Sequence, residues 1–532
     1  MGNTQKEYQD RVKDDSSVEA LPTLTSPINQ PDPDVEKIGN GATLNREVSG
    51  PPYSAFSNGM KWWIIFLVSI SALISPFAAT LYYPALNVMS DVLHISPTMT
   101  NVSLTTYMIA QAIAPAIIGN LSDNSGRRIA FLVSYVIFIL ANIGLALQTN
   151  YAALLILRMV QAVGASASIA LTVAVTADIA TSAERGTYNG YASAGILFGP
   201  AFGPMIGGVL AQYLGWRSIF WFLAIYGVVL LIVFLVFLPE TCRNVVGNGS
   251  IPATGLNQSV IGYIQQRKNR NSGGETESTI TPAEKRKFVM PNPLLTLKIL
   301  GEKESCIVLL YNGLFFTGLM VTTASIPDLF KTNYGLDELK VGLCYIASGT
   351  GALFSALSTG HILDWNFRRH AALLNIPITK GKQQDLRNFP IEKARLQVAV
   401  PGHIIGTAAL VAFGWTVKFQ THIAWPEIAL FFLGFGITTA FGVTNNLLVD
   451  FHRDKPATAT AAVNFVRCLM SAGGSVAIIP MCRAMNPGWA FTLIALIYTV
   501  LIAVVFWIMR NGMKWREELE AKKAALAAVT TA

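Results

Sequence analysis

The chain has 532 residues, of which 52% are hydrophobic and 13% charged, and its mean hydropathy is +0.45. A soluble protein of this length would need more charge to cover its surface, so these values exclude a soluble globular class. The formal net charge of +8 does not indicate a nucleic-acid partner, because the basic residues lie in segments between long apolar runs.

Residues 1–58 are rich in Asp, Glu, Ser, Pro and Asn and lack hydrophobic periodicity, which predicts a disordered tail. Apolar runs of about 20 residues then recur, each long enough to cross a hydrocarbon core of roughly 30 Å. Hydropathy predicts twelve transmembrane helices, six on each side of a polar, basic linker. The predicted spans are 62–84, 98–118, 129–147, 151–176, 188–212, 217–238, 305–327, 339–359, 397–416, 424–448, 456–480 and 488–510.

This pattern predicts an all-α polytopic membrane protein built from two six-helix bundles. Lysine and arginine gather in one set of loops, whereas 87–97 and 148–151 contain neither. By this bias, both termini and the linker are expected to face the cytoplasm. The expected domains are a cytoplasmic tail over 1–58, a first bundle over 59–240, a cytoplasmic linker over 241–304, a second bundle over 305–512 and a cytoplasmic tail over 513–532.

A charged loop after the second predicted span is repeated after the eighth. The first copy reads GNLSDNSGRR over 119–128 and the second reads GHILDWNFRR over 360–369. The copies align without a gap, and of the glycine, acid and arginine positions that form the pattern only Gly126 has no counterpart, since it falls opposite Phe367. This repetition predicts two related halves that meet inside a membrane. The residues of the pattern are Gly119, Asp123, Gly126, Arg127, Arg128, Asp364, Arg368 and Arg369.

The composition of this loop favours a gate. Gly119 is expected to permit a tight reversal, and Asp123 to lie just before the third span, where helix N–H groups favour a carboxylate. Arg127 and Arg128 are expected to reach lipid phosphates or acids on neighbouring helices. Such charge pairs would latch one side shut and open when a partner is protonated or pulled away. Topology and capping would explain an isolated loop, but the repetition favours gating.

Two spans carry a basic residue within hydrocarbon. In the fourth span Arg158 lies one helical turn from Gln161, and in the eleventh Asn464 lies one turn from Arg467. An arginine at this depth is costly and normally faces the bundle interior or water. We interpret Arg158 as part of a polar site for proton or substrate movement, rather than as a snorkelling side chain. Asp178, at the end of the fourth span, is a candidate partner for Arg127.

The fifth span contains GILFGPAFGPMIGGVL, in which glycines recur every four residues. They form one bare helical ridge that another helix can approach closely, and the prolines kink the helix. This span is expected either to pack tightly or to provide a bend and sliding contact between the halves. Its key residues are Gly199, Pro200, Gly203, Gly207 and Gly208.

The remaining candidates for a central substrate cavity are aromatic and amide side chains, each of which could equally be a packing residue. Such a lining suits amphipathic or cationic organic solutes. An enzyme is not expected, because the chain has no nucleotide loop, H-E-x-x-H or nucleophile elbow. Five cysteines without C-x-x-C spacing indicate no metal site. The cavity candidates are Tyr107, Gln111, Asn312, Phe315, Phe316, Tyr345, Asn445, Asn446, Asn464 and Arg467.

These motifs resemble signatures of the major facilitator superfamily. GNLSDNSGRR resembles its G-x-L-x-D-x-x-G-R-[KR] loop, LRMVQAVGA its fourth-span R-x-x-Q-x-x-G signature, and GPAFGPMIGG the antiporter signature of its fifth span. LPET over 238–241 and the stretch NFVRCLMSAGG resemble fungal twelve-span drug:proton antiporters of the quinidine-resistance type. The likeness covers about residues 60–512.

The resemblance implies a major facilitator fold, alternating access, no cofactor, a monomer and residence in the plasma membrane. The expected function is export of drugs, xenobiotics or secondary metabolites by proton antiport, as in multidrug efflux. The alternative is proton-coupled or facilitated transport of one metabolite, such as an organic acid or polyamine. Several family members carry an acid in the first span, which ISPFAATLYYPAL lacks. Asp123 and Asp178 are therefore the candidate proton carriers.

Overall fold

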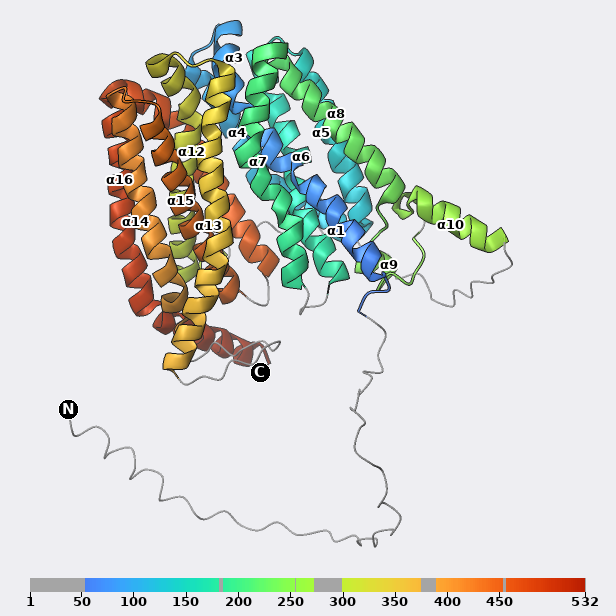
Figure 1. Ribbon diagram of the computed structural model, residues 1–532. Coiled ribbons are helices and arrows are strands. Elements are labelled where there is room, and N and C mark those ends of the chain that lie inside the picture. The colour runs from blue at the N-terminus through green and yellow to red at the C-terminus, as the bar shows by residue number, and fades with distance from the viewer. Residues whose placement is uncertain are drawn as a thin grey trace, which may run out of the picture. The chain divides into compact units, whose positions relative to one another are not determined.

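The computed structural model describes residues 53–180, 185–253, 255–271, 299–374, 389–452 and 456–531. Most of the predicted tail, residues 1–52, and much of the predicted linker lie outside these residues. The described part of the chain is built from α-helices and short 3-10 turns joined by brief connections (Figure 1).

We refer to the helices before the linker as the N half. The first span is divided into two helices and a 3-10 turn, with Pro76 in the second helix and Pro84 in the turn. The elements are α1 (Asn58–Ala72), α2 (Ile74–Thr80), η1 (Tyr83–Ala85), α3 (Leu86–Val92), α4 (Pro97–Ser125), α5 (Arg127–Leu147), α6 (Tyr151–Ile179), α7 (Arg185–Leu214) and α8 (Arg217–Phe237).

Short linker elements follow, and then the helices that we call the C half. The linker contains α9 (Arg243–Val246), η2 (Gly255–Asn257) and α10 (Val260–Asn271). The C half comprises α12 (Lys303–Tyr334), α13 (Glu338–Leu373), α14 (Ile391–Lys418), α15 (Ala424–Phe451) and α16 (Pro456–Thr531). In α16 two helices meet at a kink at Asn486, where φ is 61° and ψ is 160°.

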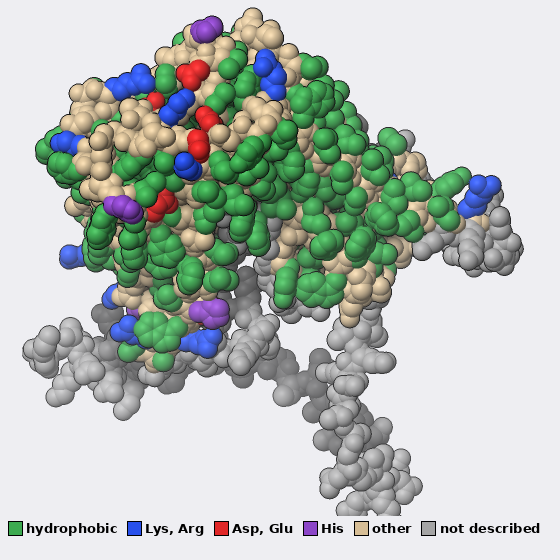
Figure 2. Space-filling model, turned by 45° about the horizontal axis from the view of Figure 1, so that its top comes forward, with side chains coloured by type: hydrophobic (Ala, Val, Ile, Leu, Met, Phe, Trp, Pro, Cys, Tyr) green, Lys and Arg blue, Asp and Glu red, His purple; other side chains and the backbone are tan. Residues whose placement is uncertain are grey.

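The helical spans agree with the hydropathy prediction. Ten helical segments of the described chain are long and apolar enough to cross a membrane, and α7 covers the remaining predicted span over 188–212. One of the ten segments, Ala459–Glu518, contains both helices of α16, so every predicted span is helical. In the view of Figure 2 hydrophobic side chains cover the sides of the helices, while charged side chains gather at the end facing the viewer. An all-helical polytopic membrane fold is therefore confirmed.

The helices have two distinct ends. At the first, Lys331 Nζ lies 3.0 Å from Asp91 Oδ2, and the Asn87 side chain donates a hydrogen bond to the carbonyl of Pro327 at 2.6 Å. Both α4 and α13 begin at this end and run to the other, where α9 and α10 lie (Figure 1). We call the latter the linker end and the former the opposite end. The two copies of the repeated pattern both lie at the linker end.

Neither copy has the loop shape that the sequence predicted. Helix α4 continues through Gly119 to Ser125, so the prediction that Gly119 makes the reversal is wrong. The reversal occurs at Gly126, whose φ of 110° favours glycine. The second copy has Phe367 at the equivalent position, and α13 runs through it without a break. Without a residue suited to positive φ, the helix simply continues.

Candidate functional site

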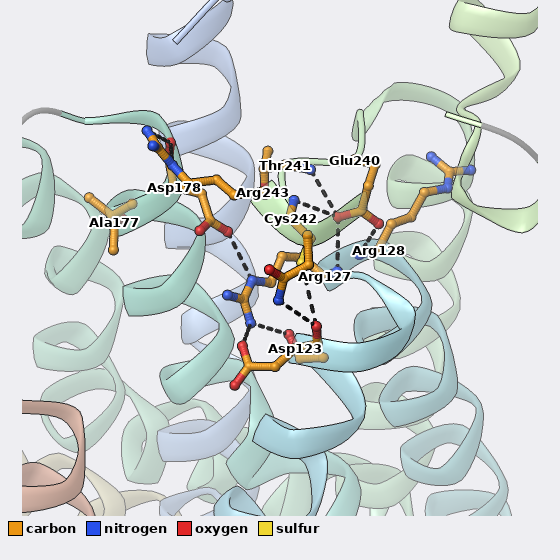
Figure 3. Close-up of polar contacts among 12 residues, drawn as sticks. Asp123, Arg127, Arg128, Ala177, Asp178, Glu240, Thr241, Cys242 and Arg243 are labelled. Carbon is orange, nitrogen blue, oxygen red and sulfur yellow. Dashed lines mark hydrogen bonds and ion pairs between the residues drawn. The ribbon is translucent and has the colours of Figure 1, made fainter. Parts of the chain in front are cut away.

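The reversal between α4 and α5 is held by a cluster of charges, shown in Figure 3. Arg127 Nε lies 2.9 Å from Asp178 Oδ2, on the penultimate residue of α6. Arg127 Nη1 donates to Ser122 Oγ at 2.8 Å and also pairs with Asp123. The Arg127 and Asp178 side chains are only 12% and 10% exposed. One guanidinium therefore ties the adjoining ends of three helices together at the linker end.

A further acid, Glu240, completes this cluster and was assigned no role from the sequence. Its carboxyl group accepts backbone N–H groups from Arg127 at 2.9 Å, Arg128 at 3.1 Å, Thr241 at 2.9 Å and Cys242 at 2.8 Å. It thus satisfies the first free donors of α5 and meets the positive end of that helix. Burial raises the pKa of Glu240 above its ordinary value, although the four N–H donors oppose this.

Arg128 makes contacts that differ from those expected from the sequence. Its guanidinium donates to the carbonyls of Phe234 at 3.0 Å and Leu235 at 2.7 Å, and also to that of Leu238, at the end of α8. Its Nε donates to the carbonyl of Leu256 in η2 at 3.0 Å. Arg128 is 1% exposed, so the prediction that it reaches lipid phosphates or acids is wrong. It caps a helix instead.

In the C half the ion pair is formed by residues other than the predicted ones. Asp364, Arg368 and Arg369 are exposed on α13, and none of them forms an ion pair with another described residue. An ion pair of the same kind is made by Arg395 and Asp450, whose Nε and Oδ2 atoms lie 3.1 Å apart. Asp450, like Asp178, is the penultimate residue of its helix. Each half therefore joins the start of its third span to the end of its fourth.

Arg158 lies at the centre of the N half and is completely buried. Its Nη1 donates to the carbonyl of Ala78 at 3.0 Å and to Gln161 Oε1 at 2.6 Å. The rings of Tyr82 and Tyr107 each lie 4.4 Å from its guanidinium carbon. Its Nε and Nη2 are buried without a hydrogen-bond partner, and no acid in the described chain pairs with it. A buried cation is thus left without a counter-charge.

Arg467 on α16 has similar surroundings in the C half. Its Nη2 donates to Asn464 Oδ1 at 2.7 Å, and its Nε is buried without a partner. Its guanidinium carbon lies 4.7 Å from the ring centre of Phe316 and 5.6 Å from that of Phe441. It also has no ion-pair partner among the described residues. Each half therefore holds one arginine between two aromatic rings.

Helix α4 links these two arginines across the halves. Tyr107 covers Arg158, and Gln111 follows one turn later on α4. The carbonyl of Gln111 accepts a hydrogen bond from the Asn464 side chain at 3.1 Å, and its side chain donates to Ser75 Oγ at 3.3 Å. Five predicted residues, together with Arg158 and Gln161, therefore belong to one connected region. These five are Tyr107, Gln111, Phe316, Asn464 and Arg467.

The other cavity candidates lie elsewhere. Asn312 donates to Thr444 Oγ1 at 2.7 Å, and Phe315 stacks on Tyr498 with ring centres 4.4 Å apart. The Tyr345 hydroxyl donates to the carbonyl of Thr323 at 2.6 Å. Asn312 and Phe315 are buried packing positions within the C half, whereas the buried Tyr345 ring also stacks on Tyr83 of the N half, with ring centres 5.8 Å apart. Of the remaining pair, Asn445 is half-buried and Asn446 exposed.

The glycine ridge of α7 packs mainly within its own half. A Cβ atom on Gly199 would lie 2.2 Å from Pro76, and one on Gly203 would lie 2.2 Å from the Thr80 hydroxyl. Gly207 approaches the carbonyl of Leu81 in the same way. Gly208 instead faces α13, where its Cβ would lie 3.2 Å from Gly342 Cα. The exposed Pro200 lies one turn from Pro204 on α7.

This geometry defines a two-half helical membrane protein with charged residues at its centre and at one end. The family model described as Major Facilitator Superfamily matches residues 68–475. Over 473 residues the chain is 42% identical to MFS-type transporter phiD of a fungal species (strain ATCC 74256), which covers 89% of this chain and 71% of that protein. It is 34% identical over 484 residues to citrate exporter 1 of Aspergillus niger, covering 90% and 91% of the two chains.

Solved structures agree on the fold. The partially occluded inward-open structure of the xylose transporter XylE from E. coli matches with a TM-score of 0.60 at 13% identity, covering 84% of this chain and 97% of that one. The chain belongs to the major facilitator superfamily, a family of membrane transporters rather than enzymes.

Proposed function

We propose that this transporter exports a small organic anion, by alternating access and in exchange for protons. The observation that carries the substrate class is the buried Arg158, which has unpartnered guanidinium nitrogens and no carboxylate partner in the described chain. A carboxylate of the substrate can accept a hydrogen bond from each of these two nitrogens. Opposite unit charges about 4 Å apart attract by about 4 kcal/mol at an effective dielectric constant near 20.

The aromatic rings extend this argument to the rest of the substrate. Arg158 lies between two tyrosines and Arg467 between two phenylalanines. These rings suit the apolar or planar part of a molecule that carries one or two acidic groups. The same positive charges disfavour polyamines and other cations. The relationship to a protein named citrate exporter supports the same class.

Alternating access is supported by where the halves touch. Contacts between described residues join the halves at the opposite end. They include the ion pair Asp91–Lys331 and the hydrogen bond that the Asn87 side chain donates to the carbonyl of Pro327. There the Gly208 backbone also approaches Gly342. We infer that this end is closed and that the linker end, with its basic loops, faces the cytoplasm. The charge cluster around Arg127 would then control opening on the cytoplasmic side, in a monomer of the plasma membrane.

Multidrug efflux of the quinidine-resistance type is the second candidate, because the fifth span carries the antiporter-like sequence GPAFGPMIGG. The two candidates differ in the charge of the substrate. An anion site requires Arg158, whereas a site for neutral or cationic drugs does not benefit from it.

A ligand screen on the purified transporter tests the proposal. We expect di- and tricarboxylates to raise its melting temperature through binding to the folded state, and amines to have no effect. Arg158→Gln should abolish the carboxylate shift while Arg369→Gln, at an exposed arginine, keeps it. Stabilisation by amines alone, or an unchanged carboxylate shift in Arg158→Gln, would refute an anion site.

A further inference from the structure

Two buried carboxyl groups share one small space at the linker end of the C half. Glu304 lies in the first turn of α12 and is 6% exposed, and Glu392 lies in the first turn of α14 and is 1% exposed. Both side chains lie beside Gly512 of α16. A Cβ atom added to Gly512 would be 2.6 Å from Glu392 Cγ and 2.9 Å from Glu304 Oε1. The first turns of α12 and α14 thus bring two acids together against α16.

Among the residues that the structure describes, one positive charge pairs with these acids. Arg516 Nη1 lies 3.3 Å from Glu392 Oε1, and its Nη2 donates to the carbonyl of Phe389 at 2.9 Å. Glu304 Oε1 is buried and has no hydrogen-bond partner among the described residues. Within the described part of the chain, two acids and one arginine therefore leave one negative charge buried and uncompensated.

The other charged groups around the pair have partners of their own or are exposed. His452 Nε2 lies 2.8 Å from Glu302 Oε2, and the ion pair between Arg395 and Asp450 was described above. Lys303 Nζ lies over the ring of Trp515, 4.7 Å from its centre. Lys393 on α14 is exposed, and so are Arg510, Lys514, Glu517 and Glu518 on the turns of α16 near Gly512.

Two buried carboxylates this close cannot both remain ionised without a second cation, so the pair must take up a proton. The proton then belongs to the pair rather than to either residue. The protonated carboxyl group has an O–H that can donate a hydrogen bond within the pair, where Glu304 Oε1 otherwise has no hydrogen-bond partner among the described residues. We propose that Glu304 and Glu392 form a site for one proton, with Arg516 as its fixed counter-charge.

This site links a proton to the packing of the first turns of α12 and α14 against α16. Loss of the proton would place two negative charges against each other and favour separation of α12, α14 and α16 at the linker end. The site itself does not depend on the proposed function. The role of its proton in exchange does depend on the proposed function. Proton binding is therefore tested on the protein alone, without a transported substrate.

Infrared spectroscopy of the purified full-length protein tests the site. We expect a carboxyl C=O band from a protonated acid at neutral pH that disappears as the pH is raised. Glu304→Gln and Glu392→Gln should each remove this band, and Glu517→Gln, at an exposed acid nearby, should leave it. A band that persists in both buried variants, or is absent from the native protein, would overturn the proposal.

Two further measurements apply even if one glutamine variant folds poorly. Arg516→Gln removes the counter-charge, so the band should persist to higher pH than in the native protein; an unchanged titration would count against the site. The folded protein also holds a proton that the unfolded chain has released at neutral pH, so its folding equilibrium constant should fall up to tenfold for each unit rise in pH. Glu304→Gln should lose this part of the slope, and an identical slope in both proteins would contradict the proposal.

Discussion

Gly126 and Gly119 belong to one sequence motif, but the structure predicts opposite effects for the same substitution. At Gly126 the backbone has φ 110° and ψ 152°, and a Cβ atom would lie 2.4 Å from Glu240 Oε2 and 2.7 Å from Asn257 Oδ1. At Gly119 the chain is helical and no neighbouring atom lies within 4 Å of an added Cβ. Alanine should therefore be strained at the first position and accepted at the second.

The magnitudes follow from these two environments. At Gly126 the backbone strain costs about 1–3 kcal/mol. Displacement of the Glu240 carboxyl leaves buried N–H groups of α5 unsatisfied, which costs a further 1–3 kcal/mol or so. We expect Gly126→Ala to lower the free energy of unfolding by about 2–6 kcal/mol. Gly119→Ala should raise it by up to about 1 kcal/mol, because alanine favours a helix more than glycine does.

Thermal unfolding of the two purified variants in the same detergent measures this difference. The melting temperature should fall clearly for Gly126→Ala and stay level or rise for Gly119→Ala. Equal shifts in the two variants would refute the assignment of the reversal to Gly126. A neutral Gly126→Ala would show that the contact with Glu240 contributes little.

Three other substitutions probe the ends of the helices. Asp178→Asn weakens the pair with Arg127 and should increase maleimide labelling of Cys242, a buried thiol whose pKa is raised by burial; peptide mapping that finds unchanged labelling would contradict a latch. Because burial raises the pKa of Glu240, the folded protein should lose stability as the pH rises above the ordinary glutamate value of about 4.3. Glu240→Gln should lose that component of a pH-dependent melting curve, and a curve identical to the native one would refute it. Gly342→Ala places a Cβ atom 2.6 Å from the carbonyl of Pro204, so export should fall while membrane levels stay normal; full export would show that the halves need not approach there.

The helices and the central arginines could be predicted from the sequence because they depend on local patterns. Span length follows from the thickness of hydrocarbon, and the spacing of Arg158 and Gln161 places them on one helical face. These patterns are complete within one span. The direct hydrogen bond between the two side chains, at 2.6 Å, follows from the same spacing.

The residues that the sequence missed depend on contacts between distant segments. Glu240 binds the backbone of Arg127, which is 113 residues away, and nothing in its own stretch marks that partner. Arg395 was not predicted, because the segment 360–369 that aligns with 119–128 lies on α13. The equivalent ion pair joins α14 and α15. The ion pair between the third and fourth spans is thus present in both halves, but in the C half it uses residues outside the aligned motif.

The charges left uncompensated within the described chain suggest how a substrate and a proton could be coupled without touching. Arg158 lacks a negative partner at the centre, and the pair Glu304–Glu392 has Arg516 but lacks a second positive partner at the linker end. In an antiporter the two ligands favour different states, so release of the proton should strengthen binding of the anion. Typical coupling free energies of about 1–3 kcal/mol correspond to a change in affinity of about 5- to 150-fold.

Titration calorimetry with a carboxylate that stays fully ionised over the pH range measures this coupling. In the native protein the affinity should rise with pH, and in Glu304→Gln, which mimics the protonated acid, it should be weak and independent of pH. Glu517→Gln should behave as the native protein does. An affinity that falls with rising pH would refute antiport, because the proton and the anion would then favour the same state. If the affinity of the native protein is independent of pH while the infrared band titrates, the proton site exists but is not coupled to binding of the anion.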